Sequence, residues 1–469
     1  MLQWNSFHFT GLEMDSKKID LFENSSIPAA VAKLAIPSVL ACIVMILYNL
    51  ADTFFVGMLN DPLQTASVSL AAPALLAFNA VNNLFGVGGA SLMSRSFGKR
   101  DYETAGKTSA FSFYLALACS VAISALYLCF KTPVLRLLGA DSTTASATAE
   151  YLKWTVALGA IPAIMNMILS NLVRSEGSAL QASIGVISGA LLNTVLDPFF
   201  VLPQFLGMGA AGAGCATFIS NCFAMLYLLS VIFIRRKETA ISLNPGKFSF
   251  DGYISREVFG VGVPAAIQNL LNVTGSLILN NFTAQYGAAA VSAMGIAHKA
   301  NLLPLYITMG ITQGVMPFIG YNYSSGDRRR MKDAILCVLR ITVVITLVMA
   351  AVYFFLSGEL IALFMKDAEV VKHGGILLRE MAVGIPFLAL DFMVVAVFQA
   401  TGKGKYSLIF ALCRKLALEI PAIILFNRLQ PLYGMGWSQP AAEFVLSVAA
   451  LIMLVKIFRE NPDTGAGAG

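Results

Sequence analysis

The feature that most constrains this chain is a series of long apolar runs, about twelve in number, each of roughly 20 residues or more, the length that spans a bilayer as a helix. They are too long for strands of a membrane barrel, which need only about 9–11 residues. We therefore predict an all-α polytopic membrane protein with about 12 transmembrane helices. The runs cover residues 33–56, 64–94, 107–130, 153–174, 179–203, 209–234, 257–284, 288–321, 331–356, 375–400, 405–427 and 437–458.

The composition excludes a fold that buries one compact core in water. Hydrophobic residues make up 57% of the 469 residues and charged residues only 12%. Soluble domains carry about 25% charged residues, and they need that polarity to cover their surface.

The formal net charge of +6 is explained by orientation in a membrane. Lys and Arg gather in the connections that follow even-numbered runs, about 16 against about 7 in the odd ones, which is a positive-inside bias. We therefore expect a multi-pass protein of the cytoplasmic (inner) membrane with both termini in the cytoplasm, and no nucleic-acid partner.

The N-terminal residues and the cysteines carry little further information. The first 25 or so residues lack the basic and apolar regions of a cleaved signal peptide. The seven cysteines lie in apolar runs without C-x-x-C spacing, so neither a disulfide framework nor a zinc site is expected.

The two halves of the chain repeat one another. Pro37 and Pro264 are 227 positions apart, and a Gly-Met-Gly triplet at 207–209 recurs at 434–436 with the same offset. Each unit contains six helices, so both enter the membrane from the same side and are parallel repeats. The predicted organisation is a cytoplasmic tail (1–27), an N-lobe with helices 1–6 (28–234), a cytoplasmic linker (235–256), a C-lobe with helices 7–12 (257–458) and a C-terminal tail (459–469).

Two acidic residues of the N-lobe form the main candidate site. An ionisable group inside a membrane costs at least about 2.5–3.5 kcal/mol and marks function by default. Asp52 follows Asn49 by three residues and Asp197 follows Asn193 by four, so each pair shares one helix face. These oxygens, with the hydroxyl of Thr217, suit a hard cation such as Na⁺, or the carboxylates hold a proton. The alternatives are an interfacial helix end for Asp52 and a turn-forming Asp-Pro for Asp197.

Other ionisable residues in the apolar runs leave their roles open. Asp391 lies in the middle of a run, where it either faces substrate, carries a proton or belongs to a structural pair. Glu419 follows Lys415 by four residues, and a local ion pair is the simpler account. The sequence does not decide whether Glu419, His298 and Lys299 are functional or structural.

No pattern indicates an enzyme. The chain has no Walker phosphate loop, no Ser/His/Asp arrangement and only three histidines, so ATP hydrolysis and nucleophilic catalysis are not expected. We expect no cofactor, with Na⁺ or H⁺ as a coupling ion.

Three motifs resemble the multidrug and toxic compound extrusion (MATE) transporters: AVAKLAIPSVLACIVMILYNLADTFFVG in the first helix, LNTVLDP in the fifth and GMGAAGAGCAT in the sixth. The similarity extends from about residue 28 to about residue 458 and looks closest to the bacterial multidrug exporters. It implies twelve helices in two lobes, and export of cationic or amphipathic compounds driven by inward flow of Na⁺ or H⁺.

The resemblance also implies site residues. The family's first-lobe cation site falls on Asp52, Asn193, Asp197 and Thr217, and Asp391 matches an acidic position in the tenth helix of some members.

One position departs from a branch of the family. That branch carries a Glu about eight positions after the proline of the seventh helix, where this chain has Asn272, counted from Pro264. A C-lobe cation site built on that Glu is therefore in doubt, and we place coupling in the N-lobe. Asn272 and Asp391 remain candidates for substrate binding or second-lobe coupling.

Taken together, the sequence predicts a secondary antiporter that exports organic cations or drugs, a function linked to antibiotic resistance, by alternating access in exchange for Na⁺ or H⁺. Its expected partners are small molecules and membrane lipid, and we expect a monomer. One alternative is a flippase for lipid-linked intermediates, which would have a basic cleft for pyrophosphate. The other is a membrane receptor without transport.

Overall fold

The computed structural model describes residues 15–59 and 61–459, whose regular elements are helices throughout. In the first half of the chain, two short helices and two π-helical segments interrupt the long helices or join them to one another. Its helices are α1 (Ser16–Glu23), α2 (Ile27–Gly57), α3 (Pro62–Val81), η1 (Asn82–Val87), α4 (Gly88–Gly98), α5 (Tyr102–Cys129), α6 (Lys131–Leu137), α7 (Ala145–Leu152), η2 (Lys153–Leu158), α8 (Ala160–Ser175), α9 (Ala179–Val201) and α10 (Ala210–Ile234).

The second half has a similar succession of helices after the connection that follows α10. Its helices are η3 (Pro245–Lys247), α11 (Gly252–Ala284), α12 (Ala288–Ser325), α13 (Arg328–Phe355), α14 (Ser357–Ala362), α15 (Ala368–Ala382), α16 (Ile385–Ala400), α17 (Gly404–Leu412), η4 (Cys413–Glu419), α18 (Ile420–Leu429), η5 (Tyr433–Trp437) and α19 (Ser438–Arg459).

The long helices account for the apolar runs. Nine helices among the described residues are long and apolar enough to cross a membrane, and two bent pairs raise this number to eleven. The pairs bend by 48° before α8 and by 49° before α16. The remaining run is α17–η4–α18, whose π-helical segment carries Arg414, Lys415 and Glu419. The predicted all-α membrane fold is confirmed.

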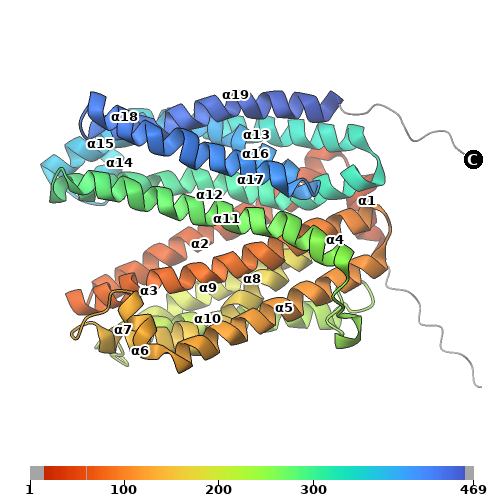
Figure 1. Cartoon of the computed structure of the whole chain (residues 1–469), viewed down its shortest axis with the longest axis horizontal. Coiled ribbons are helices and arrows are strands. Elements are labelled where there is room, and N and C mark those ends of the chain that lie inside the picture. The colour runs from red at the N-terminus through yellow and green to blue at the C-terminus, as the bar shows by residue number, and fades with distance from the viewer. Residues whose placement is uncertain (1–14, 60, 460–469) are drawn as a thin grey trace, which may run out of the picture.

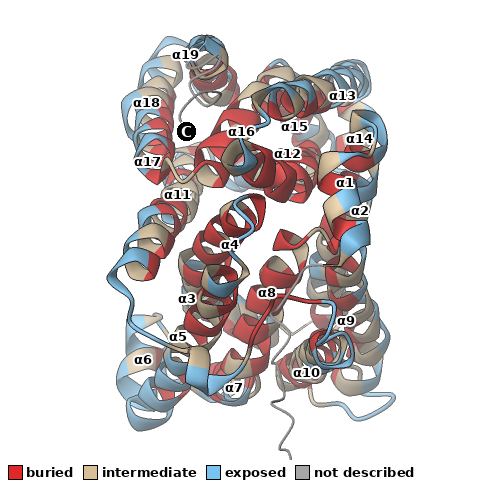
Figure 2. Cartoon of the chain, turned by 90° about the vertical axis from the view of Figure 1, so that its right-hand side faces the viewer, coloured by how far each residue is buried: buried red, intermediate tan, exposed pale blue. Residues whose placement is uncertain are grey.

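The helices form two bundles that follow the order of the chain. Figure 1 shows α2–α10 in the lower bundle and α11–α19 in the upper one. Viewed end on, the buried residues concentrate on the helices that lie between the bundles, and the outer helix faces are largely exposed (Figure 2). Exposed Leu, Phe and Val side chains on these outer faces are expected where a protein meets lipid.

Glycines allow the two bundles to approach closely, as small residues do between membrane helices. α2 packs on α12, where a Cβ added at Gly310 would lie 2.8 Å from Cα of Val39. α11 packs on η1 and α4, where a Cβ at Gly262 would overlap the carbonyl oxygen of Leu84. Each bundle thus contributes its first long helix to the interface.

Helix α1 connects the bundles at one end of the molecule, which we call the α1 end. The Glu23 carboxylate accepts hydrogen bonds from Arg100 of the first bundle at 2.8 Å and from the Tyr321 hydroxyl of the second at 2.6 Å. Lys18 donates to Glu176, in the α8–α9 turn, at 2.8 Å. The described part of the chain begins at α1 and ends with the last turn of α19 on this side of the molecule (Figure 1).

Candidate ion-coupling and substrate sites

Four of the predicted N-lobe residues come together on three helices. Asp52 is on α2, near the end of that helix that lies away from α1; Asn193 and Asp197 are on α9, and Thr217 is on α10. Because Asn193 and Asp197 are separated by one helical turn, they point in the same direction. Asn193 and Asp197 are completely buried, which gives their hydrogen bonds particular weight.

The Asn193 side chain connects the carboxylate to the hydroxyl. In the amide orientation that satisfies both of its ends, its nitrogen donates to Oδ2 of Asp197 at 3.0 Å. Its oxygen then accepts from the backbone nitrogen of Thr217 at 3.1 Å and from the Thr217 hydroxyl at 3.3 Å. Asn193 therefore fixes the position of Asp197 relative to α10.

The two carboxylates lie close enough to interact electrostatically, and neither has a basic partner among the described residues. Asp52 and Asp197 interact electrostatically, and no Lys, Arg or His of the described residues forms an ion pair with either. Oδ1 of Asp52 is buried and accepts no hydrogen bond from the residues that the structure describes. A site with two uncompensated carboxylates favours a positively charged ligand.

Tyr48 completes this site and was not predicted. Its hydroxyl is within hydrogen-bonding reach of Thr217 and close to both carboxylates. Tyr48 precedes Asp52 by four residues, so the same spacing rule that selected Asn49 could have found it. Asn49 itself is exposed and donates to the Met45 carbonyl of its own helix at 2.7 Å.

These oxygens are the kind that hard cations prefer: two carboxylates, an amide oxygen and two hydroxyls. A carboxylate is also a proton acceptor, so the same pair of side chains is able to bind H⁺ in place of a metal cation. The chemistry of the donor set therefore fits either Na⁺ or H⁺.

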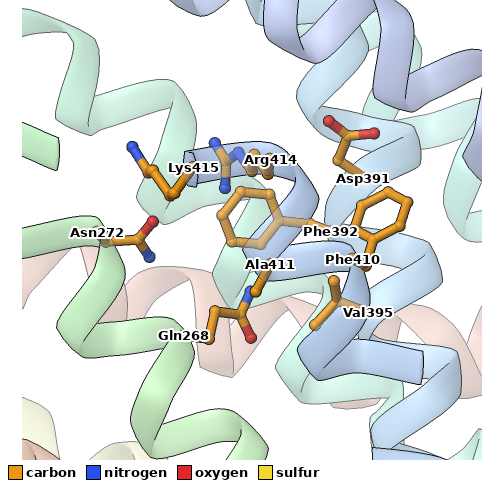
Figure 3. A pocket seen from close by; sticks show the side chains of 9 residues that line it. All are labelled: Gln268, Asn272, Asp391, Phe392, Val395, Phe410, Ala411, Arg414 and Lys415. Carbon is orange, nitrogen blue, oxygen red and sulfur yellow. The ribbon is translucent and has the colours of Figure 1, made fainter. Parts of the chain in front are cut away.

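A second constellation lies in the second bundle, where a pocket is lined by both predicted C-lobe residues. Asn272 and Gln268 extend from α11, Asp391 from α16, and Arg414 and Lys415 from η4 (Figure 3). Apolar side chains complete the pocket: Phe392, Val395, Phe410 and Ala411.

Most of the charged side chains around this pocket form ion pairs. Nζ of Lys415 and Oε1 of Glu419 are 2.6 Å apart, which confirms the local ion pair expected from their spacing. Arg414 pairs with Glu443 of α19, a residue to which the sequence analysis assigned no role. His298 of α12 lies close enough to Lys415 and Glu419 to interact with them electrostatically, whereas Lys299 is exposed.

Comparison with known proteins identifies the family to which the chain is similar. The MatE family model matches two segments of the chain, residues 37–199 and 264–425. The multidrug export protein MepA of Staphylococcus saprophyticus is 30% identical over 441 residues, covering 94% of this chain and 96% of that protein. MepA of Staphylococcus aureus is 29% identical over the same length.

Solved structures agree with these relatives. A crystal structure of MATE in complex with MaL6 superposes with a TM-score of 0.89 at 25% sequence identity, covering 94% of this chain and 98% of that chain. An outward-facing multidrug resistance MATE transporter of the MOP superfamily gives the same TM-score and identity, covering 95% of this chain and 99% of that one.

The fold is that of a membrane transporter and not of an enzyme. The chain belongs to the MATE family.

Proposed function

We propose that this protein exports organic cations and amphipathic drugs across the cytoplasmic membrane in exchange for Na⁺ or H⁺. Its relatives are named multidrug export proteins, which supports drugs as the substrate class. The site formed by Asp52, Asn193, Asp197 and Thr217 is the proposed coupling site. We place the α1 end in the cytoplasm, on the basis of the positive-inside bias of the connections.

The observation that carries this proposal is the pair of carboxylates without a basic partner. Asp52 and Asp197 require an added positive charge, and a transported cation supplies it. Because Asp52 lies on α2, the ion acts on a helix that packs against α9 in its own bundle and against α12 in the other. Occupancy of the site is thereby connected to the interface between the bundles.

The exchange follows from this connection. An ion that binds Asp52 and Asp197 from the outer side neutralises them and allows α2 and α9 to pack without charge repulsion. A state in which the carboxylates are neutral has less attraction for a cationic drug, so the drug leaves. Coupling requires that the ion and the drug favour different states or compete for the same charge.

The charge of the N-lobe site favours this function over the flippase alternative. A lipid pyrophosphate needs basic residues, whereas Asp52 and Asp197 offer only negative charge to a ligand. Arg414 and Lys415 of the second bundle are engaged in ion pairs with Glu443 and Glu419.

The test is efflux of ethidium from cells that lack their major exporters, with Na⁺ and pH gradients imposed separately. We expect one of the two gradients to drive efflux, which names the coupling ion. The Asp52→Asn variant keeps the size of the side chain and removes its charge, so we expect it to be inserted normally and to lose gradient-driven efflux.

Asp333→Asn is the matched control, because Asp333 is exposed at the start of α13. We expect it to transport like the wild type. Wild-type efflux by Asp52→Asn would overturn the coupling assignment. Absence of efflux under either gradient, with normal insertion, would overturn the proposed substrate class.

A further inference from the structure

The second bundle contains five ionisable side chains that are more than nine-tenths buried and come from three helical segments. Asp391 is on α16, Arg414, Lys415 and Glu419 are on η4, and Glu443 is on α19. The N-lobe site uses none of them. Charges buried at this depth persist only when they are compensated.

The two ion pairs of this cluster involve two of its three acidic side chains. Arg414 compensates Glu443, and Lys415 compensates Glu419. Asp391 is the third acid, and neither of its oxygens accepts a hydrogen bond from a donor group of the described residues. His298, on α12, interacts electrostatically with Lys415 and Glu419.

Asp391 lies beside Glu443, and their carboxyl groups are within hydrogen-bonding reach of one another. Two ionised carboxylates have only acceptor oxygens, so they repel at this distance. One proton placed between them turns the repulsion into a hydrogen bond and balances the cluster: two negative charges then face two positive ones.

The pocket beside Asp391 provides the space through which such a proton exchanges. Its volume is about 10 Å³, close to the roughly 10–15 Å³ that one water molecule needs. The amides of Gln268 and Asn272 line it together with Asp391 (Figure 3), so a water molecule there has polar partners. The same volume is too small for a drug molecule.

We propose that Asp391 and Glu443 share a single proton, with Arg414 as the fixed counter-charge, and that this second site takes H⁺ but no metal cation. A proton adds almost no volume, whereas a metal ion needs several oxygen ligands close to the positive charges of Arg414 and Lys415, which repel it. The N-lobe carboxylates have no basic partner and are open to either ion. The use of this proton in transport rests on the proposed antiport, but its presence does not.

Infrared difference spectroscopy of the purified full-length protein tests the proposal, because a protonated carboxyl group has a carbonyl stretching band that a carboxylate lacks. At neutral pH we expect the difference between wild type and Asp391→Asn to contain this band, and we expect the band to shift in D₂O. The Asp52→Asn variant, altered in the other bundle, retains it. A wild type without the band overturns the proposal.

The Glu443→Gln variant distinguishes two explanations of the band: a proton shared with Glu443, and a proton that Asp391 holds because it is buried. In this variant Arg414 is left without its carboxylate and pairs with Asp391, so we expect loss of the band although Asp391 is intact. Persistence of the band would overturn the shared pair, because Asp391 would then hold its proton without Glu443. Glu443→Gln also carries the test if Asp391→Asn does not fold.

Replacing choline chloride by NaCl tests the selectivity. We expect Na⁺ to leave the band of the Asp391–Glu443 pair unchanged, and its loss on addition of Na⁺ would overturn the exclusion of metal cations. These outcomes are independent of the efflux measurement. A failure of ethidium export with the band present contradicts the proposed function and leaves the protonated pair standing.

Discussion

Arg95 of α4 and Glu257 of α11 form an ion pair that joins the two bundles, with Nη1 and Oε2 2.6 Å apart. Both side chains are mostly buried, so the pair is shielded from water and stronger than a surface pair. It lies in the part of the molecule where Glu23 of α1 also bridges the bundles. Closure of the α1 end therefore depends on a small number of charged contacts.

Breaking this pair is expected to open the α1 end. Glu257→Gln removes one charge and shifts the equilibrium towards the open state by about 1–3 kcal/mol, or about 5–150-fold. Cys42 is buried on α2, near Arg174 of α8 and Tyr306 of α12. In a variant in which the other cysteines are replaced, the alkylation rate of Cys42 measures this opening. We expect faster alkylation of Cys42 in Glu257→Gln.

The charge-reversed double variant Arg95→Glu/Glu257→Arg is the control for this effect. It restores an ion pair between the same positions, and we expect slow alkylation to return. Equal rates in the wild type and in Glu257→Gln would contradict a role of the pair in closure.

Two glycines on α11, two residues apart, provide a second test of the interface between the bundles. Gly262→Ala places a methyl group against the carbonyl oxygen of Leu84, so α11 has to move away from the first bundle. A methyl group at Gly260 meets nothing within 4 Å. We expect Gly262→Ala to lose most efflux while it is still inserted, and Gly260→Ala to transport normally. Comparable efflux of the two variants would show that this close approach is dispensable.

The Lys18–Glu176 pair predicts unequal effects of removing its two partners. Lys18→Met leaves a buried carboxylate without compensation, a change that costs about 3–5 kcal/mol. Glu176→Gln costs less, because Lys18 keeps its hydrogen bond to the Glu238 carbonyl at 3.2 Å and Thr239 keeps a partner at position 176. Thermal unfolding midpoints of the two variants in detergent check this order, and a lower midpoint for Glu176→Gln would contradict it.

The same glutamate gives a pH dependence. Burial raises the pKa of Glu176 above its usual 4.5, against the lowering effect of Lys18. The folded state therefore holds this proton more tightly than the unfolded chain does. The resulting stabilisation is complete below the unfolded pKa and is lost as the pH rises through the folded pKa. We expect the unfolding midpoint of Glu176→Gln to vary less with pH over that interval than the wild-type midpoint.

At the N-lobe site, the hydroxyl of Thr217 is expected to contribute to ion affinity. Thr217→Val keeps the shape of the side chain and removes about 0.5–1.5 kcal/mol of hydrogen bonding, or about 2–12-fold in affinity. We expect a higher ion concentration for half-maximal efflux. Thr194→Val on α9 is the matched control, because the Thr194 hydroxyl donates to the Ala190 carbonyl of its own helix at 3.0 Å. An unchanged ion concentration for half-maximal efflux in Thr217→Val would show that the Thr217 hydroxyl does not contribute to ion binding.

Much of the N-lobe site could be predicted from the sequence, because its signals are local. Asn193 and Asp197 are one helical turn apart, and an acid in an apolar run is conspicuous wherever it occurs. Tyr48 escaped prediction since a tyrosine in a membrane helix has many ordinary uses, and only its position beside Thr217 distinguishes it.

The C-lobe cluster was only partly predictable. The Lys415–Glu419 pair follows from spacing within one helix, and the structure confirms it. The partners Arg414 and Glu443 are 29 positions apart and lie on different helices, so no periodicity could pair them. Asp391 was recognised as costly in a membrane, but whether another charge compensates it depends on which helices surround α16.

The sequence by itself determined the helical membrane fold, because the length and spacing of apolar runs are dictated by the thickness of a bilayer and by the need to satisfy backbone hydrogen bonds within each helix. Only the tertiary structure decided which charges are compensated. Whether Asp52 lacks a basic partner while Glu443 has Arg414 is a matter of distances between helices, which are set by packing of the whole bundle and leave no trace in local sequence.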